Sequence, residues 1–140
     1  MQSCLPELAK SIYEKMLNDK PLQQKVNKRH NTYSRKETPF PYIVYGEFQS
    51  NPSNVSGCQG EEVFVTFNIW SLYNGGFELE NIDKDLKRLF ANTNDLEIEN
   101  NCLFYSFFDS SDEFIDVDHE QKARHGVLIV RMLIRHGAVV

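Results

Sequence analysis

An acidic segment in the last third of the chain is the first place where side chains could carry out chemistry. It contains Asp109, Asp112, Glu113, Asp116, Asp118, His119 and Glu120, and His125 follows closely. An EF-hand calcium loop needs Asp or Asn at alternate positions and a glycine at the sixth, and this segment has neither the spacing nor the glycine. We therefore expect no bound metal and interpret the segment as a solvated acidic loop or an electrostatic docking surface. A small metal-dependent hydrolase using Asp116, Asp118 and His119 stays open as an alternative.

Sites for nucleophilic catalysis or phosphate binding are not indicated elsewhere. The sequence has no GxSxG motif, and Cys58 follows Gly57 without a recognisable catalytic signature. Asn74-Gly75-Gly76 precedes a predicted helix but lacks both glycine-rich phosphate motifs, so a hinge and helix start explains it. The three cysteines are widely spaced, which fits unpaired thiols in a reducing compartment. We expect no catalytic residue and no cofactor.

A basic stretch earlier in the chain offers the opposite charge. It contains Lys25, Lys28, Arg29, His30, Arg35 and Lys36. The formal net charge of −5 and the lack of a zinc-finger or RNP pattern argue against nucleic-acid recognition. Opposite charges on two patches of one molecule favour head-to-tail contact between copies, so the basic and acidic stretches could join neighbours in a ring. Simple solvation of both stretches is the alternative.

Hydrophobic spacing predicts the elements that position these segments. An amphipathic helix is expected over 5–17 and a short helical turn over 21–26, followed by irregular or extended chain over 27–41. A second helix is expected over 77–91, with Asp83, Lys84, Asp85 and Lys87 in water and an apolar face made of Phe77, Ile82, Leu86, Leu89 and Phe90. Alternation predicts strands at 42–48, 61–71, 96–98, 102–108 and 126–134, with a turn at Asn100-Asn101.

This order of elements predicts an α+β fold, a largely antiparallel sheet flanked by two main helices, in a single domain over residues 1–140. The segment Gln49–Gly60 is expected to be a loop or a long hairpin connection. This loop and a second one, Ser110–Lys122, would project from the sheet and face partners. No stretch reaches the roughly 20 apolar residues of a membrane span, and no signal peptide precedes the first helix. We expect a protein that is made in a cytoplasm and does not enter a membrane.

Two strand segments have a distinctive form. Pro39-Phe-Pro-Tyr-Ile-Val-Tyr-Gly46 leads into the first strand, and Val63 to Ser71 ends in a Trp-Ser pair. Both resemble strands of the small tail-completion and tail-terminator (head–tail joining) proteins of tailed bacteriophages. The helices at 5–17 and 76–90 and the strand at 125–131 also match that family in position. The resemblance covers nearly the whole chain by pattern and order, but the acidic segment 109–121 is enlarged here, so its role is not carried over.

The resemblance implies an assembly protein of a tailed phage or phage-like particle, found in the virion at the head–tail interface. Such proteins form a ring, usually hexameric, that closes the tail tube and joins it to the head connector, and they have no catalytic residues. The expected partners are further copies of the chain, the tail tube protein and the head connector protein. A monomeric adaptor of another protein is a further alternative. The residues expected to contact partners are Lys28, Arg29, Arg35, Asn54, Asp112, Glu113, Asp116 and Asp118.

Overall fold

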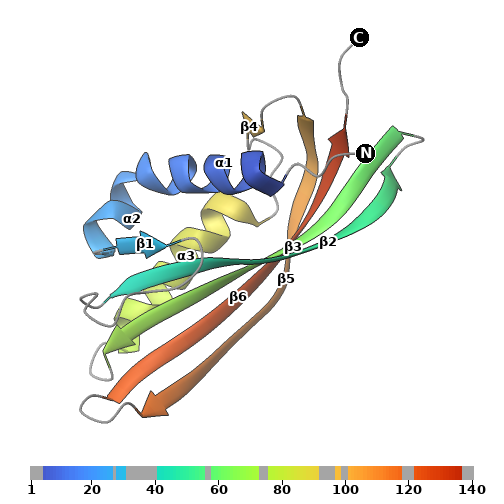
Figure 1. Cartoon of the computed structure of the whole chain (residues 1–140). Coiled ribbons are helices and arrows are strands. Elements are labelled where there is room, and N and C mark those ends of the chain that lie inside the picture. Colours follow the sequence, from blue (N-terminus) through green and yellow to red (C-terminus); the bar gives the residue numbers. More distant parts are fainter. Residues whose placement is uncertain are drawn as a thin grey trace.

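The described residues form one twisted β-sheet and three helices (Figure 1). The computed structural model describes residues 5–26, 28–30, 41–55, 58–72, 76–91, 97–98, 101–117 and 122–136. Its helices are α1 (Leu5–Leu17), α2 (Lys20–Lys25) and α3 (Gly76–Phe90). Its strands are β1 (Lys28–His30), β2 (Tyr42–Val55), β3 (Cys58–Leu72), β4 (Glu97–Ile98), β5 (Asn101–Val117) and β6 (Lys122–His136).

The strands follow the order β1-β2-β3-β6-β5-β4. The short β1 pairs with β2 in parallel, whereas every other neighbouring pair is antiparallel. The predicted α+β class, with a largely antiparallel sheet and two main helices, is therefore confirmed.

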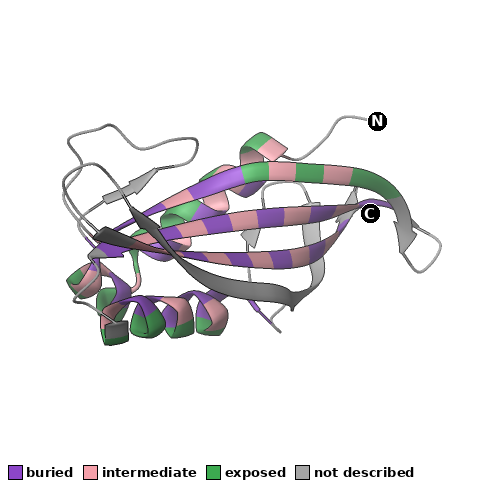
Figure 2. Cartoon of the chain, turned by 90° about the horizontal axis from the view of Figure 1, so that it is seen from below, coloured by how far each residue is buried: buried purple, intermediate pink, exposed green. Residues whose placement is uncertain are grey.

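The core lies between one face of the sheet and the helices. Every second residue of the two central strands is buried on this face, as the alternating colours along them show (Figure 2). In β3 these are Val63, Val65, Phe67 and Ile69, and in β6 they are Leu128, Val130, Met132 and Ile134. The helices bury residues at three- and four-residue spacing against them, namely Leu8, Ile12 and Met16 of α1 and Leu79, Ile82, Leu86, Leu89 and Phe90 of α3.

Aromatic contacts fix α3 on the sheet. The ring of Phe67 lies 5.1 Å from that of Phe90 and 6.2 Å from that of Tyr45, measured between centroids. At the start of α3, the hydroxyl of Ser71 donates a hydrogen bond of 2.6 Å to Glu78. These contacts join the end of β3 and its middle to the helix that follows it in the chain.

Both predicted loops are wrong over most of their length. Residues 49–55 continue β2 and residues 58–60 begin β3, so the two strands form one long hairpin. Residues 110–117 continue β5, which pairs with β6 as far as Val117 and Lys122. Polar residues misled the prediction, because strands that face solvent tolerate them and pairing with a neighbour supplies the backbone hydrogen bonds.

Smaller corrections concern the ends and faces of elements. Lys28–His30 forms a strand within the region predicted as irregular or extended, and Asn101 starts β5 rather than completing a turn. Phe77 was expected on the apolar face of α3, yet its side chain is 82% exposed. Asp85 was expected in water but is only 7% exposed, because α2 packs beside this part of α3.

Candidate interaction surfaces

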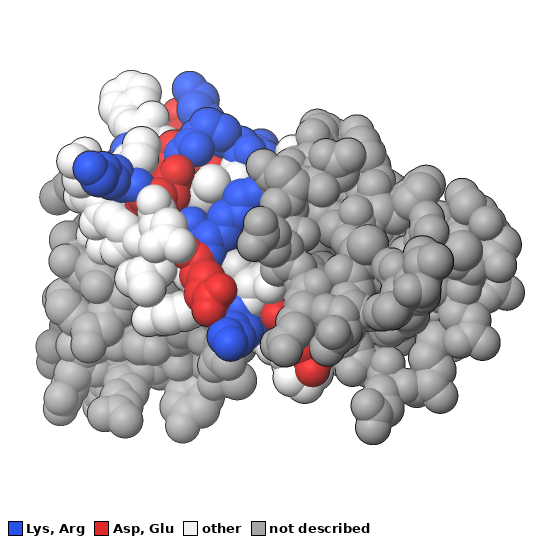
Figure 3. Space-filling view, turned by 90° about the horizontal axis from the view of Figure 1, so that it is seen from above, with Lys and Arg blue, Asp and Glu red and all other residues white. Residues whose placement is uncertain are grey.

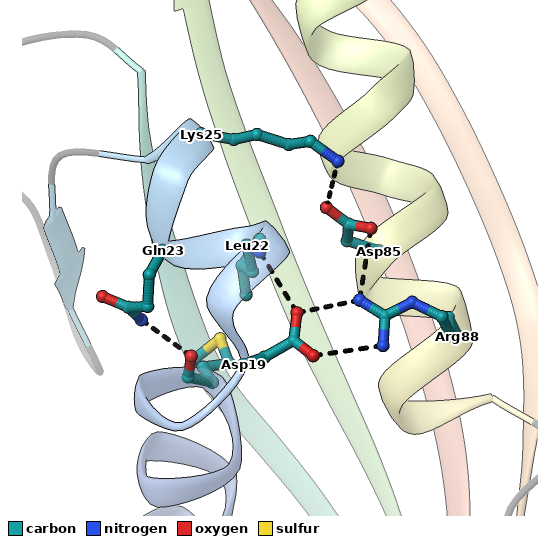
Figure 4. A network of polar contacts seen from close by, with 7 residues as sticks. Asp19, Leu22, Gln23, Lys25, Asp85 and Arg88 are labelled. Atoms are coloured by element: carbon teal, nitrogen blue, oxygen red, sulfur yellow. Dashed lines mark hydrogen bonds and ion pairs between the residues drawn. The ribbon is translucent and has the colours of Figure 1, made fainter.

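A polar network holds α2 against α3 on the helical side of the molecule (Figure 4). The guanidinium of Arg88 donates to both carboxylate oxygens of Asp19, at 3.1 and 2.8 Å, and to Asp85 at 3.3 Å. Lys25 donates to the other oxygen of Asp85 at 2.6 Å. The backbone NH of Leu22 donates to Asp19 at 3.1 Å, so the same carboxylate also caps the start of α2.

The charges of this network are balanced by direct contact. The guanidinium of Arg88 holds the pKa of Asp19 below its ordinary value, with help from the NH of Leu22 and against the opposing effect of burial. The same ion pair raises the pKa of Arg88. Lys and Arg side chains gather over the helices with acidic residues between them (Figure 3). This network therefore positions secondary structure and leaves no reactive group for chemistry.

The other face of the sheet carries a row of stacked rings. Trp70 of β3 stacks on His125 of β6 with centroids 4.0 Å apart and planes at 8°, and Tyr42 of β2 follows at 6.4 Å from Trp70. His125 Nε2 hydrogen-bonds Asn68 Oδ1 at 2.8 Å. The row crosses three strands at the level where β1 pairs with β2.

Beyond this row the same face is a mixture of apolar and charged side chains. Arg131 of β6 forms an ion pair with Glu62 of β3. Half-buried neighbours on the two central strands are Phe64, Val127, Ile129 and Leu133. The buried residues of all three helices belong to the core on the opposite face, and no described helix contributes to this one. We call this face the open face.

Exposed apolar side chains also occur on the helical side. Phe77, at the start of α3, is 82% exposed, and Tyr13 and Leu17 lie one turn apart on α1 at 41% and 44%. Such side chains indicate a contact site only where they belong to a larger apolar patch.

The residues predicted to contact partners lie at opposite edges of the sheet. Lys28 and Arg29 are in β1, and Asn54 is near the end of β2. Asp112, Glu113 and Asp116 are in β5, on the far side of β3 and β6. Arg35 and Asp118 lie outside the described residues, as does His119 of the alternative hydrolase site. The strand order thus places β1 at one edge of the sheet and β5, with the described acidic residues, on the other side of β3 and β6.

The described part of the chain contains neither a metal-binding cluster nor a helix that could span a membrane. Within it, no group of three or more His, Cys, Asp or Glu residues is arranged to hold a metal ion. None of the described helices has the length and apolar character needed to cross a membrane.

Sequence reasoning missed the network of Asp19, Asp85 and Arg88 and the row of stacked rings. The ring row depends on the register of three strands, which no local pattern encodes. A partial signal for Asp19 was present, because an Asp followed by Lys-Pro is typical of a helix N-cap with proline in the first turn.

Comparisons with solved structures support the fold. The chain is similar to a chain of the virion of a native gene transfer agent particle, with a TM-score of 0.78 and 12% identity over 96% of this chain and 99% of that one. It is also similar to the gp17 protein of bacteriophage SPP1, with a TM-score of 0.50 and 21% identity over 96% of this chain and 95% of that one. No curated protein sequence matches the chain.

The structural similarities, at 12% and 21% identity, support the fold alone, whereas a match to a family model shows the protein family. The model described as tail completion protein gp17 matches residues 10–135, which include every helix and strand in whole or large part. This confirms the predicted resemblance and the expectation of a structural virion protein rather than an enzyme. The chain belongs to the tail completion protein gp17 family.

Proposed function

We propose that this protein forms a ring, with six copies as the expected number, that closes the tail tube and joins it to the head connector. Family membership makes it a tail completion protein. The proposal adds to this the ring and its two partners, the tail tube and the head connector. It is argued from the positions of apolar residues on the two sides of the sheet.

The observation that carries the proposal is the one-sided construction of the sheet. The core lies between the helices and one face, while the open face keeps Trp70, Phe64 and Ile129 half-buried. A sheet with one partly apolar face that no described helix covers, and with exposed Phe77 on the other side, has two different surfaces for contact. Two different surfaces on one molecule produce head-to-tail association, which closes into a ring when the rotation between copies allows it.

Continuous backbone pairing between the sheet edges of two copies is not expected. The β2 edge contains Pro52, which has no NH to donate, and a bulge between Gly46 and Gln49. β5 has register shifts at Leu103/Tyr105 and Phe108/Ser110. Bulges and proline on edge strands oppose continuous pairing with another chain, so side chains are expected to dominate the contact.

Negative-stain imaging and light scattering of the purified protein test the proposal, first alone at increasing concentration and then with tail tubes. We expect ring-shaped particles and tubes that carry one such ring at an end and no longer elongate when tube protein is added. A protein that stays monomeric under both conditions, and leaves tube growth unchanged, is a monomeric adaptor and contradicts the proposal.

A further inference from the structure

The two edges of the sheet have opposite charge at the same height along the strands. The register can be followed strand by strand from β1 to β5. Arg29 of β1 is level with Ile43, Ile43 with Ile69, Ile69 with Gly126, and Gly126 with Glu113 of β5. By the same path Lys28 is level with Phe114 and His30 with Asp112.

The charge pattern continues along the rest of each edge. Beyond β1, the described β2 edge from Gln49 to Val55 contains only uncharged residues. The part of β5 that is level with it, from about Leu103 to Phe107, is also uncharged and contains Phe104, Tyr105 and Phe107. The acidic residues begin at Asp109 and extend to Asp116, around the level of β1. Two described charges depart from this pattern. Glu47, at the bulge, is at about the level of Asp109, and Glu97 of β4 pairs with Cys102, at the level of the uncharged Ser53 on the other edge.

We infer that neighbouring copies in the ring meet edge to edge, with β1 of one copy against the acidic part of β5 in the next. The inference rests on the ring proposed above and adds which surfaces form it. The occupant of each edge is a second copy, because the complementary charge lies on the same chain at the matching height. When copies are placed side by side across the strand direction, β1 of one copy and the acidic part of β5 in the next are at the same level along the strands.

The contact does not need continuous backbone pairing. Attraction between groups of opposite charge orients two surfaces and excludes wrong arrangements, since like charges placed together are strongly repelled. A copy that approached with β5 facing β5 would place two acidic edges together, whereas the head-to-tail arrangement places unlike edges together. Edge charge thus selects the arrangement that can close into a ring.

Charge reversal at either edge tests the inference. The variant K28E/R29E has two acidic edges and the variant D112K/E113K has two basic edges. We expect each alone to lower the association constant for ring formation by roughly tenfold or more. The chain that carries all four substitutions restores the opposite signs and is expected to form rings again. The matched control K10E/K84E reverses two exposed lysines on α1 and α3 and is expected to leave ring formation unchanged.

An equal mixture of the two single-edge variants is the sharpest measurement. Acidic and basic copies can then alternate, so a ring with an even number of copies re-forms in the mixture although neither variant forms it alone. Sedimentation velocity gives the ring fraction, and circular dichroism confirms that each variant is folded. The neutral variants K28Q/R29Q and D112N/E113Q repeat the test with a smaller change if a reversed variant fails to fold.

The outcomes separate this inference from the proposed function. If the wild-type protein forms rings and the edge variants form them equally well, the edge contact is wrong and the ring proposal stands. If the wild-type protein forms no ring alone or with tail tubes, the ring proposal is wrong and the edge contact with it. Rings that are lost in each variant and recovered in the mixture support both.

Discussion

At the scale of single residues, Asp19 connects two parts of the helical layer. Its carboxylate accepts the NH of Leu22 and two hydrogen bonds from Arg88, so it caps α2 and anchors it to α3. A helix of six residues has little stability of its own, since helices this short are marginal without tertiary contacts. The position of α2, and of β1 directly after it, therefore depends on this carboxylate.

Replacing Asp19 with alanine is expected to lower the free energy of unfolding by about 0.5–2 kcal/mol, the usual range for a lost N-cap. Part of the loss depends on pH. Because the folded pKa of Asp19 lies below its ordinary value of 3.8, its contribution is present above that pH and disappears as the pH falls through the folded pKa. Denaturant unfolding between about pH 7 and pH 2 measures both effects, and the variant is expected to lose less stability in acid than the wild type.

Asp83 provides the control for this prediction. It pairs with Lys87 one turn away at 2.9 Å on the same helix, without a capping role. Its replacement by alanine is expected to cost about 0.3–0.5 kcal/mol. Equal losses for the Asp19 and Asp83 variants would show that the cap contributes nothing.

At the scale of elements, the seating of α3 on β6 depends on the absence of a side chain at Gly126. A Cβ placed there would lie 3.0 Å from Leu79 Cδ1, which is tighter than ordinary packing. Replacing Gly126 with valine is expected to destabilise the fold by about 1–3 kcal/mol through overpacking, and alanine by less because the end of Leu79 can move. Thermal or denaturant unfolding of both variants checks the order.

A second substitution tests whether contact with Leu79 causes the loss of stability in the Gly126→Val variant. The pair Gly126→Val and Leu79→Ala is expected to cost at least about 1 kcal/mol less than the sum of the two single variants, since each relieves the other. Leu86 lies two turns further along α3, and Leu86→Ala combined with Gly126→Val is expected to be additive within about 0.5 kcal/mol. Additivity in both pairs contradicts a specific clash.

The bulge in β2 is a second element that has a conformational requirement. Gly46 has φ 143° and Glu47 has φ 49°. Before this bulge the odd-numbered residues of β2 lie on the face of the sheet that packs against the helices, and after it the even-numbered residues do. Replacing Gly46 with alanine is expected to cost about 1–3 kcal/mol, because L residues rarely adopt this backbone. Glu47→Gly removes strain and is expected to be neutral or slightly stabilising. A Gly46 variant as stable as the wild type in denaturant would show that the bulge can rearrange.

Helices and strands with a strong local hydrophobic periodicity could be predicted from the sequence. The polar parts into which β2 and β5 continue could not. The α1 spacing of Leu8, Ile12 and Met16 and the alternation from Val63 to Ile69 each indicate one buried face, so both elements appear where expected. The second halves of β2 and β5 are rich in polar or acidic residues, and their strand form comes from pairing with β3 and β6. Tertiary contact also explains Asp85, which is buried only because Lys25 and Arg88 approach it.

For the candidate interaction surfaces too, the sequence predicts the type of residue but not its position in the fold. Basic and acidic stretches are visible in the sequence, but their positions at opposite edges and equal height require the sheet order. Trp70 and His125 are far apart in the sequence. Their rings stack because β3 pairs with β6 in a register that places the two residues opposite each other. Composition therefore indicates what kind of contact is available, and topology determines where it is made.

At the scale of the whole molecule, the fold and the proposed ring depend on different forces. An apolar core between the helices and the sheet holds each copy together, and this core includes Phe67 and Phe90 at 0% exposure. The proposed contact between copies is made by the charged residues of β1 and β5 at the two sides of the sheet. Salt screens charges in water far more than it affects buried apolar contacts, and the Debye length falls from roughly 10 Å at about 0.1 M to roughly 3 Å at about 1 M.

Raising the salt concentration from about 0.1 M to about 1 M is therefore expected to dissociate the ring while each copy stays folded. Sedimentation velocity follows the ring fraction, and thermal unfolding at each concentration follows the fold. The variant Trp70→Ala, on the open face, separates the two possible contacts, because it leaves the charged edges in place. A ring that persists at about 1 M salt but is lost in the Trp70 variant assigns the contact to the open face instead of the edges.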